Sequence, residues 1–461
     1  MTATSLARPP ASLPSLAELE RHQQALRRLA ADDARLAAEG MAALAACEAC
    51  VAGGRRVADA VRGQAQGLAE QLFGLWHVQA LAALGRRGWL SGGRDDVEPV
   101  VLALRAADLV QRLAACRYVV VPPGLWRNVH ALFAQVLERG WQGKRGRADA
   151  LTPALCYARL SLLGLTACGS LEPAKLATLF AWVDAQAAAV AFATEGEYRR
   201  SGGFVANLAS DAPPRFYDAA EPVPANALGL DLTGALAAVA ARLNDNADAL
   251  PVAELQLLLR LRSEWGGQAR RRHLRYRRLQ RHTLTVHPGF TVGWCLLGGD
   301  ELAAGFEADT GADPLRWQIV DLSLSGLQLE GGDAGVEAGS VLLLGSQGGR
   351  LRCALVRRVR RQADGSALYG VEYLGKRAGA GLIRVVHSLG SQEAWQPVMI
   401  LQGDGLRGSG NMLLVEGRPF QAMRTFSLTD SAGRKTIQAT RLRSQTTRYQ
   451  LFDYKIVAIE S

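Results

Sequence analysis

The chain has 461 residues, of which 49% are hydrophobic, and it carries a net charge of +10. A chain of this length is expected to form two to four domains, and its charge points to an anionic partner without saying which. No uncharged apolar run of about 18 residues occurs, so no membrane span is expected. Residues 1–15 lack the basic and apolar regions of a secretory signal, and we therefore expect a cytoplasmic protein.

The cysteines and histidines do not form a pattern typical of catalysis. Seven cysteines spread over this length, an odd number, argue against a disulfide framework. Cys47 and Cys50 form a CxxC in an Ala-rich helical stretch, without the further ligands that a zinc site needs, and are predicted to pack as small apolar side chains. No HExxH, Walker loop, nucleophile elbow or dinucleotide fingerprint occurs. The sequence therefore predicts no enzyme, no metal site and no cofactor.

The first half of the chain is predicted to be all-α, with a helical domain over residues 1–145 and a second helical region over residues 150–265. Ser15 and Glu18 form a capping box at the start of the first helix. Apolar residues on one face predict a helix over residues 125–139. The remaining elements predicted in the second region are helices at 153–167, 173–191, 232–243 and 252–265, and a short strand at 204–208.

After Arg281 the apolar period changes from about 3.6 to about 2, and short segments alternate with Gly, Asp and Ser. Such spacing predicts a small β-barrel over residues 270–385 and a second small β domain over residues 392–461. The fold class is therefore α+β multidomain. The predicted strands are residues 283–286, 317–320, 327–329, 341–344, 351–356, 368–374, 398–401, 412–415, 436–441 and 449–457.

An arginine cluster precedes the first predicted strand. Seven of the twelve residues from 270 to 281 are Arg, and Arg277 and Arg281 give an RxxxR directly before the strand. A planar guanidinium can bind guanine O6 and N7, or a phosphate, through two hydrogen bonds and can also stack on a purine. Arg271 and Arg275 form a competing RxxxR frame further from the strand.

A second motif follows the predicted strand at 317–320. Asp321, Ser323 and Gly326 give a DxSxxG at the end of this strand. An Asp carboxylate accepts hydrogen bonds from guanine N1 and N2, and a Ser hydroxyl adds a local bond. Gly326 is expected to allow a tight turn with a positive φ and a close approach of the ligand. In the absence of a ligand the same residues would form an ordinary capped turn.

Together, in this order and in a β context, the two motifs closely resemble the cyclic di-GMP signature of PilZ domains. The segment Tyr369–Tyr373 is similar to a later strand of the PilZ barrel, and residues 157–186 and 203–214 look similar to long proteobacterial PilZ proteins with a helical N-terminal half. The resemblance implies a six-stranded barrel and a cyclic di-GMP receptor that reports to an unidentified protein partner, with the helical half as a candidate contact. The ligand-binding residues that it implies are Arg277, Arg281, Asp321, Ser323 and Gly326.

Two other classes stay open. A nucleic-acid-binding protein would also have a basic arm and a small barrel, but such folds stack bases on exposed aromatic side chains, and Tyr276 is the only aromatic residue in the arm. The other class is an adaptor or scaffold that binds no ligand, with Trp126, Trp141 and Trp182 either on its binding surface or in its core. An acidic insert at residues 298–313 separates the two motifs and has no assigned role.

Overall fold

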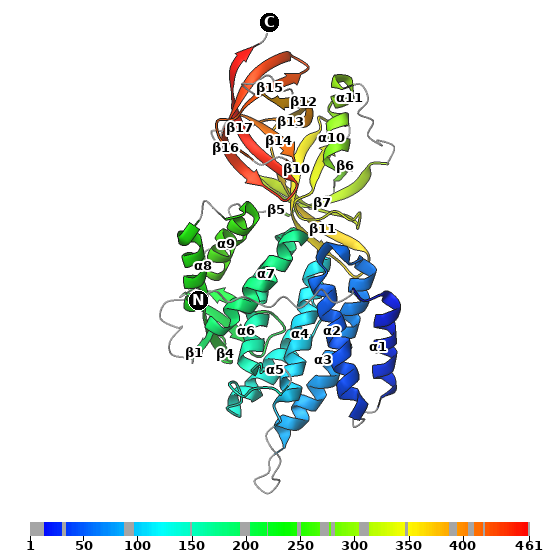
Figure 1. Cartoon of the computed structure of the whole chain (residues 1–461), viewed down its shortest axis with the longest axis vertical. Helices are drawn as coiled ribbons and strands as arrows, with labels where there is room; N and C mark the ends of the chain where they lie inside the picture. The colour runs from blue at the N-terminus through cyan, green and yellow to red at the C-terminus, as the bar shows by residue number, and fades with distance from the viewer. Residues whose placement is uncertain are drawn as a thin grey trace. The chain divides into compact units, whose positions relative to one another are not determined.

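A computed structural model of the chain divides into two compact units (Figure 1). The first unit comprises Met1–Cys168 and Pro173–Arg270, and the second comprises Gly169–Glu172 and Arg271–Ser461. Within the described ranges, no helix is long and apolar enough to cross a membrane. The residues that the structure describes are 13–29, 34–86, 96–147, 150–193, 203–218, 220–246, 250–267, 276–277, 282–303, 313–345, 349–386, 394–403, 410–417 and 420–459.

The first unit is mainly helical. The predicted capping box is confirmed, because Glu18 N donates to Ser15 Oγ at 3.2 Å and Ser15 N donates to Glu18 Oε2 at 3.3 Å. Trp126 and Trp141 are buried and Trp182 is half-buried, which favours the core-packing alternative for the first two. The helices of this unit are α1 (Leu16–Arg28), α2 (Ala34–Ala52), α3 (Asp59–Gly85), α4 (Glu98–Arg117), α5 (Leu125–Glu138), α6 (Pro153–Gly164), α7 (Pro173–Gln186), α8 (Thr233–Asn246) and α9 (Val252–Trp265).

A small antiparallel sheet interrupts the helices, so the N-terminal half is not purely α. Its strands are β1 (Ala191–Ala193), β2 (Gly203–Asn207), β3 (Arg215–Tyr217) and β4 (Ala227–Asp231), in the order β1-β4-β2-β3. The predicted strand at 204–208 corresponds to β2. The other three strands are only three to five residues long, too short for a periodic pattern to show. The helix predicted over 173–191 ends earlier, at Gln186, because a 3-10 turn (Ala187–Ala189) and then β1 follow it.

Two cysteines of the first unit fulfil the predicted packing role. Cys47 and Cys50 are buried in α2, and the Cys47 thiol donates to Ala65 O at 3.3 Å. Burial raises the pKa of Cys50 to about 11, so its thiol stays protonated at neutral pH. All seven cysteines of the chain are free thiols.

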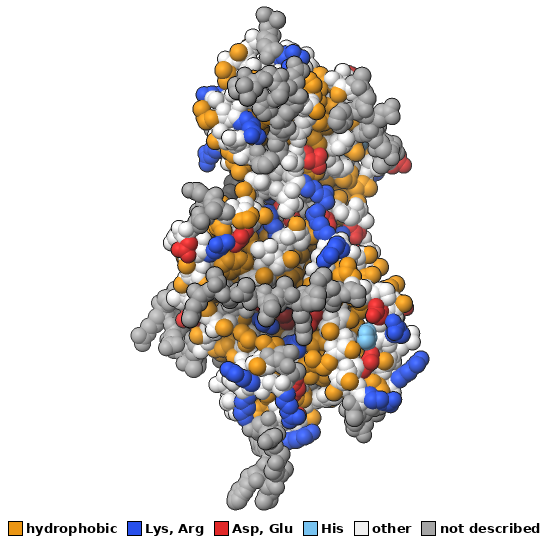
Figure 2. Space-filling model, in the orientation of Figure 1, with side chains coloured by type: hydrophobic (Ala, Val, Ile, Leu, Met, Phe, Trp, Pro, Cys, Tyr) orange, Lys and Arg blue, Asp and Glu red, His pale blue; other side chains and the backbone are white. Residues whose placement is uncertain are grey.

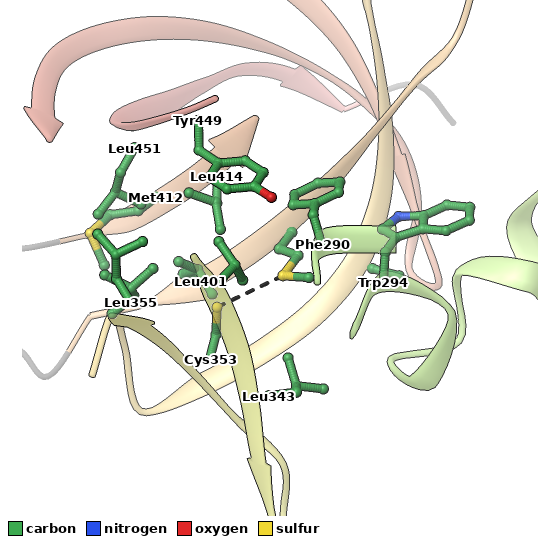
Figure 3. Close-up of a cluster of buried hydrophobic side chains, with 14 of the residues drawn as sticks. Phe290, Trp294, Leu343, Cys353, Leu355, Leu401, Met412, Leu414, Tyr449 and Leu451 are labelled. Carbon is green, nitrogen blue, oxygen red and sulfur yellow. Dashed lines mark hydrogen bonds between the residues drawn. The ribbon is translucent and has the colours of Figure 1, made fainter. Parts of the chain in front are cut away.

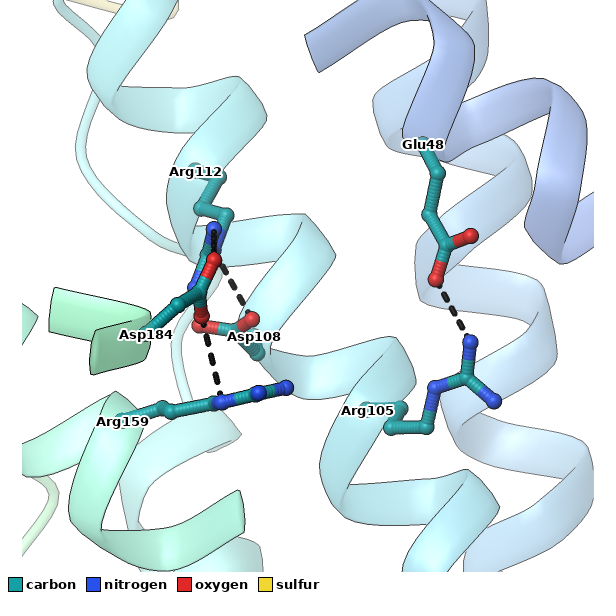
Figure 4. Close-up of polar contacts among 6 residues, drawn as sticks. All are labelled: Glu48, Arg105, Asp108, Arg112, Arg159 and Asp184. Carbon is teal, nitrogen blue, oxygen red and sulfur yellow. Dashed lines mark hydrogen bonds and ion pairs between the residues drawn. The ribbon is translucent and has the colours of Figure 1, made fainter. Parts of the chain in front are cut away.

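A charged network joins three helices of this unit (Figure 4). On α4, Arg112 pairs with Asp108 at 2.8 Å and donates to both carboxylate oxygens of Asp184 on α7, at 2.6 and 3.0 Å. Arg159 of α6 reaches the same Asp184 at 3.1 Å. Burial raises the pKa of Asp108, and the Arg112 charge opposes that rise. The ionised form of the Asp108 carboxyl group therefore depends on Arg112. Removal of one member would leave a buried charge unpaired, which is why the network fixes how these helices pack.

The loop after β2 is held against α5 by polar contacts. Asp211 accepts from Gly124 N at 2.6 Å and from Arg127 N at 3.1 Å, and so caps the start of α5. His130 of α5 is fully buried, with Nε2 at 2.9 Å from Ala212 O and Nδ1 at 2.8 Å from the Tyr157 hydroxyl. Since a carbonyl can only accept, Nε2 carries the proton and Nδ1 accepts from Tyr157 in the neutral ring.

This burial makes the stability of the first unit depend on pH. Burial lowers the pKa of His130 below its usual value, so the unfolded chain takes up the proton first. The stabilising contribution is therefore complete above about pH 6.5, the pKa of an unperturbed His, and is lost as the pH falls through that value. We expect His130→Gln to flatten the fall in stability between about pH 7 and pH 5, measured by urea unfolding at each pH.

Tyr157→Phe is the matched control, because it removes the same hydrogen bond but leaves the titrating ring in place. The Tyr157→Phe protein should have a lower free energy of unfolding at every pH, with the same dependence on pH as wild type. A wild-type slope in the His130→Gln protein would show that another group causes the acid sensitivity.

The second unit contains two closed β-barrels. Six strands form the first barrel, as the PilZ resemblance implies, in the order β7-β6-β9-β10-β11-β8, and pairing of β7 with β8 closes it. A two-residue strand, β5 (Tyr276–Arg277), extends the sheet at β7. The six barrel strands are β6 (Thr283–Pro288), β7 (Leu315–Ser323), β8 (Gly326–Gly332), β9 (Val341–Gly345), β10 (Arg352–Arg361) and β11 (Ser366–Tyr373).

The second barrel begins earlier than the sequence predicts. Residues 377–385, assigned above to the first barrel, form β12 and pair with β13 and β15 of the second. Neither β12 nor β15 was predicted as a strand. The first half of β12 is Arg-Ala-Gly-Ala-Gly, which has no β-branched or aromatic residue to signal a strand. The closed order is β12-β13-β14-β17-β16-β15, with β12 (Arg377–Val385), β13 (Gln396–Gln402), β14 (Asn411–Glu416), β15 (Thr425–Asp430), β16 (Gly433–Gln445) and β17 (Tyr449–Ile459).

The two barrels share a hydrophobic core, shown in Figure 3. All five residues of β9 are buried, because one face of the strand lines the first barrel and the other packs outward against the second. Leu343 of β9 and Leu355 of β10 meet Met399 and Leu414 of the second barrel in this cluster. A strand buried on both faces has a continuous apolar sequence, which explains the run Val341–Leu344.

A short helix between β6 and β7 completes the shared core. Helix α10 (Phe290–Leu296) contributes Phe290 and Trp294, and Trp294 Nε1 donates to Gly381 O of β12 at 2.9 Å. The acidic insert at 298–313 starts with α11 (Gly299–Leu302), where a Cβ on Gly299 would lie 2.3 Å from the Trp294 ring. The start of the insert therefore packs under this ring, and residues 304–312 lie outside the described part of the chain.

Candidate functional site

The DxSxxG motif lies on the outer face of the first barrel because β7 contains a bulge. Trp317 and Ile319 point into the barrel and are buried. The register with β8 shifts between Ile319 and Asp321, so one residue of β7 has no partner there. After the bulge Asp321 and Ser323 share the outward face, although strict alternation from Ile319 would place them inward.

The motif ends in a tight turn between β7 and β8. Ser323 is paired with Gly326, and Ser323 Oγ donates to Gly326 O at 3.2 Å. The side chain of Leu324, at the tip, is 90% exposed. Ser325 O accepts from Tyr373 N at 2.9 Å, which fastens the turn to the end of β11. One hydrogen bond within the turn and one from β11 therefore hold it in place.

Gly326 is required for a reason other than the one expected from the sequence. Its backbone does not have a positive φ, so the predicted left-handed turn is wrong. Instead, a Cβ at this position would lie 2.0 Å from Val371 O of β11. The requirement is thus the close approach of two strands, which only a residue without a side chain permits.

The structure brings part of the RxxxR motif to the same place. Strand β5 pairs with β7 so that Arg277 lies opposite Asp321 and Tyr276 lies opposite Leu322. The next strand, β6, occupies the same edge of β7, and Ile319 N donates to His282 O at 2.9 Å. Four predicted site residues therefore belong to neighbouring backbone positions. The fifth, Arg281, lies outside the described residues, as do both arginines of the competing frame.

Further polar residues on this outer face were not predicted. Gln328 of β8 lies opposite Asp321, and Glu372 of β11 lies opposite Gly326. Glu372 accepts from Arg357 Nε of β10 at 2.7 Å. The alternation around Val371, which is buried, was a signal in the sequence that Glu372 points outward. Its place beside the DxSxxG turn, however, depends on the strand register, which the sequence does not show.

The inner side of the barrel supports this face with close aromatic packing. Trp317 and Tyr369 stack with their ring centroids 4.1 Å apart, and both are buried. A Cβ on Gly331 would lie 1.9 Å from the Trp317 ring, so glycine is needed there too. The Arg352 guanidinium lies 3.5 Å from the centre of the Tyr373 ring, and burial raises the pKa of that tyrosine. In the described part of the chain, no group of three His, Cys, Asp or Glu side chains is placed to hold a metal ion.

The fold is that of a multidomain protein with a helical N-terminal half and two barrels. Comparison with models of protein families identifies the family to which this chain belongs. The model described as cyclic-di-GMP receptor FimW, N-terminal domain, matches residues 7–195, and the FimW C-terminal beta-barrel domain matches residues 382–457. The two matches cover more than half of the chain, which belongs to this cyclic-di-GMP receptor family. The family is named for a receptor and not for an enzyme activity. No curated protein matches the chain.

The contact at Gly326 can be tested directly. We expect Gly326→Ala to destabilise the second unit by about 1–3 kcal/mol, because the new methyl group must displace the β11 backbone. The measurement is urea unfolding monitored by the tryptophans of this unit. Gly332→Ala, at the other end of β8, is the control, since a Cβ there meets nothing within 4 Å. Equal stability of the two variants would contradict the close approach.

Proposed function

We propose that this chain binds cyclic di-GMP on the outer face of the first barrel and relays the binding event to a protein partner. The observation that carries the proposal is the pairing of Arg277 with Asp321, because it joins two motifs that are over forty residues apart in the sequence. Membership of a family named for a cyclic-di-GMP receptor supports the same ligand. The proposed binding residues are Arg277, Arg281, Asp321, Ser323 and Gly326.

The chemistry of these residues matches the ligand. Cyclic di-GMP carries two guanines and two phosphates, all of which accept two hydrogen bonds from a guanidinium. An Asp carboxylate such as that of Asp321 accepts from the N1 and N2 donors of guanine. Arg277 and Thr283 both pair with β7, opposite Asp321 and Gln318. These pairings support a ligand position on the outer face of β7, beside Arg277.

Calorimetry with cyclic di-GMP, with GTP and cyclic di-AMP as competitors, tests the proposal. We expect Arg277→Ala, Arg281→Ala and Asp321→Asn each to weaken cyclic di-GMP binding by at least about tenfold, since one bidentate contact to a base contributes about 1–3 kcal/mol. Arg271→Ala is the matched control within the same arginine cluster and should bind nearly as wild type. If Arg271 proves decisive and Arg277 silent, the competing frame is the correct one. If cyclic di-GMP does not bind at all, the adaptor alternative replaces the receptor.

The relay is the second part of the proposal. Along the chain, residues 268–275 link α9 to β5, so ligand contact with the arginine cluster would act on the segment that joins the helical half to the site. A ligand shifts a conformational equilibrium only by its different affinity for the two states, so the helical half must differ between them. We place the receptor in the cytoplasm, a location that seven free thiols favour. The helical half is the proposed contact for the partner.

Hydrogen exchange measures this relay. With cyclic di-GMP we expect slower exchange over residues 266–282 and altered exchange over α9 (Val252–Trp265), and Asp321→Asn should abolish both changes. Tight binding without any change in α9 would show that the barrel serves to localise the protein and does not switch its helical half.

A nucleic-acid partner has less support. Proteins that bind nucleic acids through charge gather Lys and Arg into a patch or stripe. Apart from the arginine cluster at residues 270–281, which Figure 2 does not colour by type, the Lys and Arg side chains of the described residues on the face shown stand in small separate groups among apolar and uncharged atoms. Low-micromolar binding of random oligonucleotides at physiological salt, with a steep dependence on salt, would favour this alternative.

A further inference from the structure

The outer face of the first barrel carries a second carboxylate besides Asp321, and an arginine is paired with it. The first carboxylate is Asp321, opposite Arg277 in the sheet. The second is Glu372 of β11, which pairs with Arg357 of β10 at 2.7 Å. The Glu372 side chain is 33% exposed and that of Arg357 is 42% exposed, so solvent reaches both groups.

The strand register fixes where this pair lies relative to the DxSxxG turn. Ser323, Gly326 and Glu372 form one row across three strands, because Ser323 is paired with Gly326 and Gly326 with Glu372. Residues paired in this way point to the same face of a sheet. With strands about 4.8 Å apart, Glu372 lies about 10 Å from Ser323, within the span of a dinucleotide.

Glycines separate the two carboxylates. Gly326 lies between Ser323 and Glu372, and in the neighbouring row Gly370 lies two strands from Asp321, beyond Gln328. Gly370 is partly exposed and has no side chain, so backbone forms the floor of the outer face there, whereas Gly326 is buried next to the Val371 carbonyl of β11. A flat base can approach such a floor closely, whereas larger side chains would hold it away.

We propose that Glu372 and Arg357 form a second guanine subsite. This proposal rests on the proposed binding of cyclic di-GMP at the DxSxxG face. Cyclic di-GMP has two identical guanines, and each presents donors at N1 and N2 and acceptors at O6 and N7. Asp321 can serve only one of them. Glu372 accepts from N1 and N2 of the other guanine, and Arg357, whose guanidinium has five N–H donors, supplies bonds to O6 and N7. The second subsite thus selects guanine over adenine at the second base.

A guanine subsite and a simple surface ion pair have different effects on ligand selectivity. An ion pair between exposed side chains contributes little to stability and nothing to ligand selectivity. A guanine subsite, in contrast, discriminates between cyclic di-GMP and cyclic GMP-AMP, in which one guanine is replaced by adenine. Adenine presents an acceptor at N1, which a carboxylate repels and which the amide of a glutamine can satisfy.

The experiment is calorimetry of the full chain with both dinucleotides. We expect wild type to prefer cyclic di-GMP over cyclic GMP-AMP, and Glu372→Gln and Arg357→Ala each to reduce that preference at least about tenfold. The control is Glu330→Gln, on the same outer face but opposite Gln318 and away from the turn. It should keep the wild-type preference. Thermal unfolding of each variant checks that the fold is intact.

The outcomes separate this inference from the proposed function. Loss of cyclic di-GMP binding in Asp321→Asn together with unchanged selectivity in Glu372→Gln overturns the second subsite and leaves the receptor proposal standing. Binding that is unaffected in Asp321→Asn refutes the proposed face itself. Reduced selectivity in Glu330→Gln as well as in Glu372→Gln would mean that general surface charge, and not a subsite, governs the preference, and would also overturn the inference.

Discussion

The candidate site depends on the pairing of β7 along both of its edges. One edge holds β5 and β6 in succession, and the other holds β8, which closes the barrel. Because β5 and β8 both pair with β7, Arg277 lies next to the DxSxxG motif, and the pairing of the backbones is enough to place it there. The bulge before Asp321 then decides which face presents the motif. Backbone hydrogen bonds, more than side-chain contacts, therefore build this site.

The sequence predicted elements whose signal is local. Helix α9 has the predicted bounds, Val252–Trp265, because Pro251 and Gly266 mark its ends and its apolar residues recur with the helical period. Strand β12 was missed because its two glycines and two alanines resemble a loop, and α10 because a helix of seven residues is too short to show a period. Both owe their structure to packing in the shared core, which joins residues distant in the sequence.

For the candidate site, too, the sequence predicted only what depends on residues close together in the chain. The motif residues were found because they keep fixed spacings along the chain. Glu372, by contrast, becomes a neighbour of Gly326 only through the register of β8 and β11, and the role of Gly326 itself is set by the backbone of β11. A spacing rule describes one strand at a time, whereas a face of a barrel is formed by several.

The hydrogen bond from Trp294 to Gly381 has a consequence for dividing the protein into fragments. The family match to the C-terminal barrel starts at residue 382, inside β12. A cut at that boundary would separate Gly381, the acceptor of this bond, from the rest of its strand. It would also expose Leu343 and Leu355, which the second barrel covers. Each fragment would then have an exposed apolar surface that favours aggregation. The smallest autonomous piece of this region therefore keeps both barrels together.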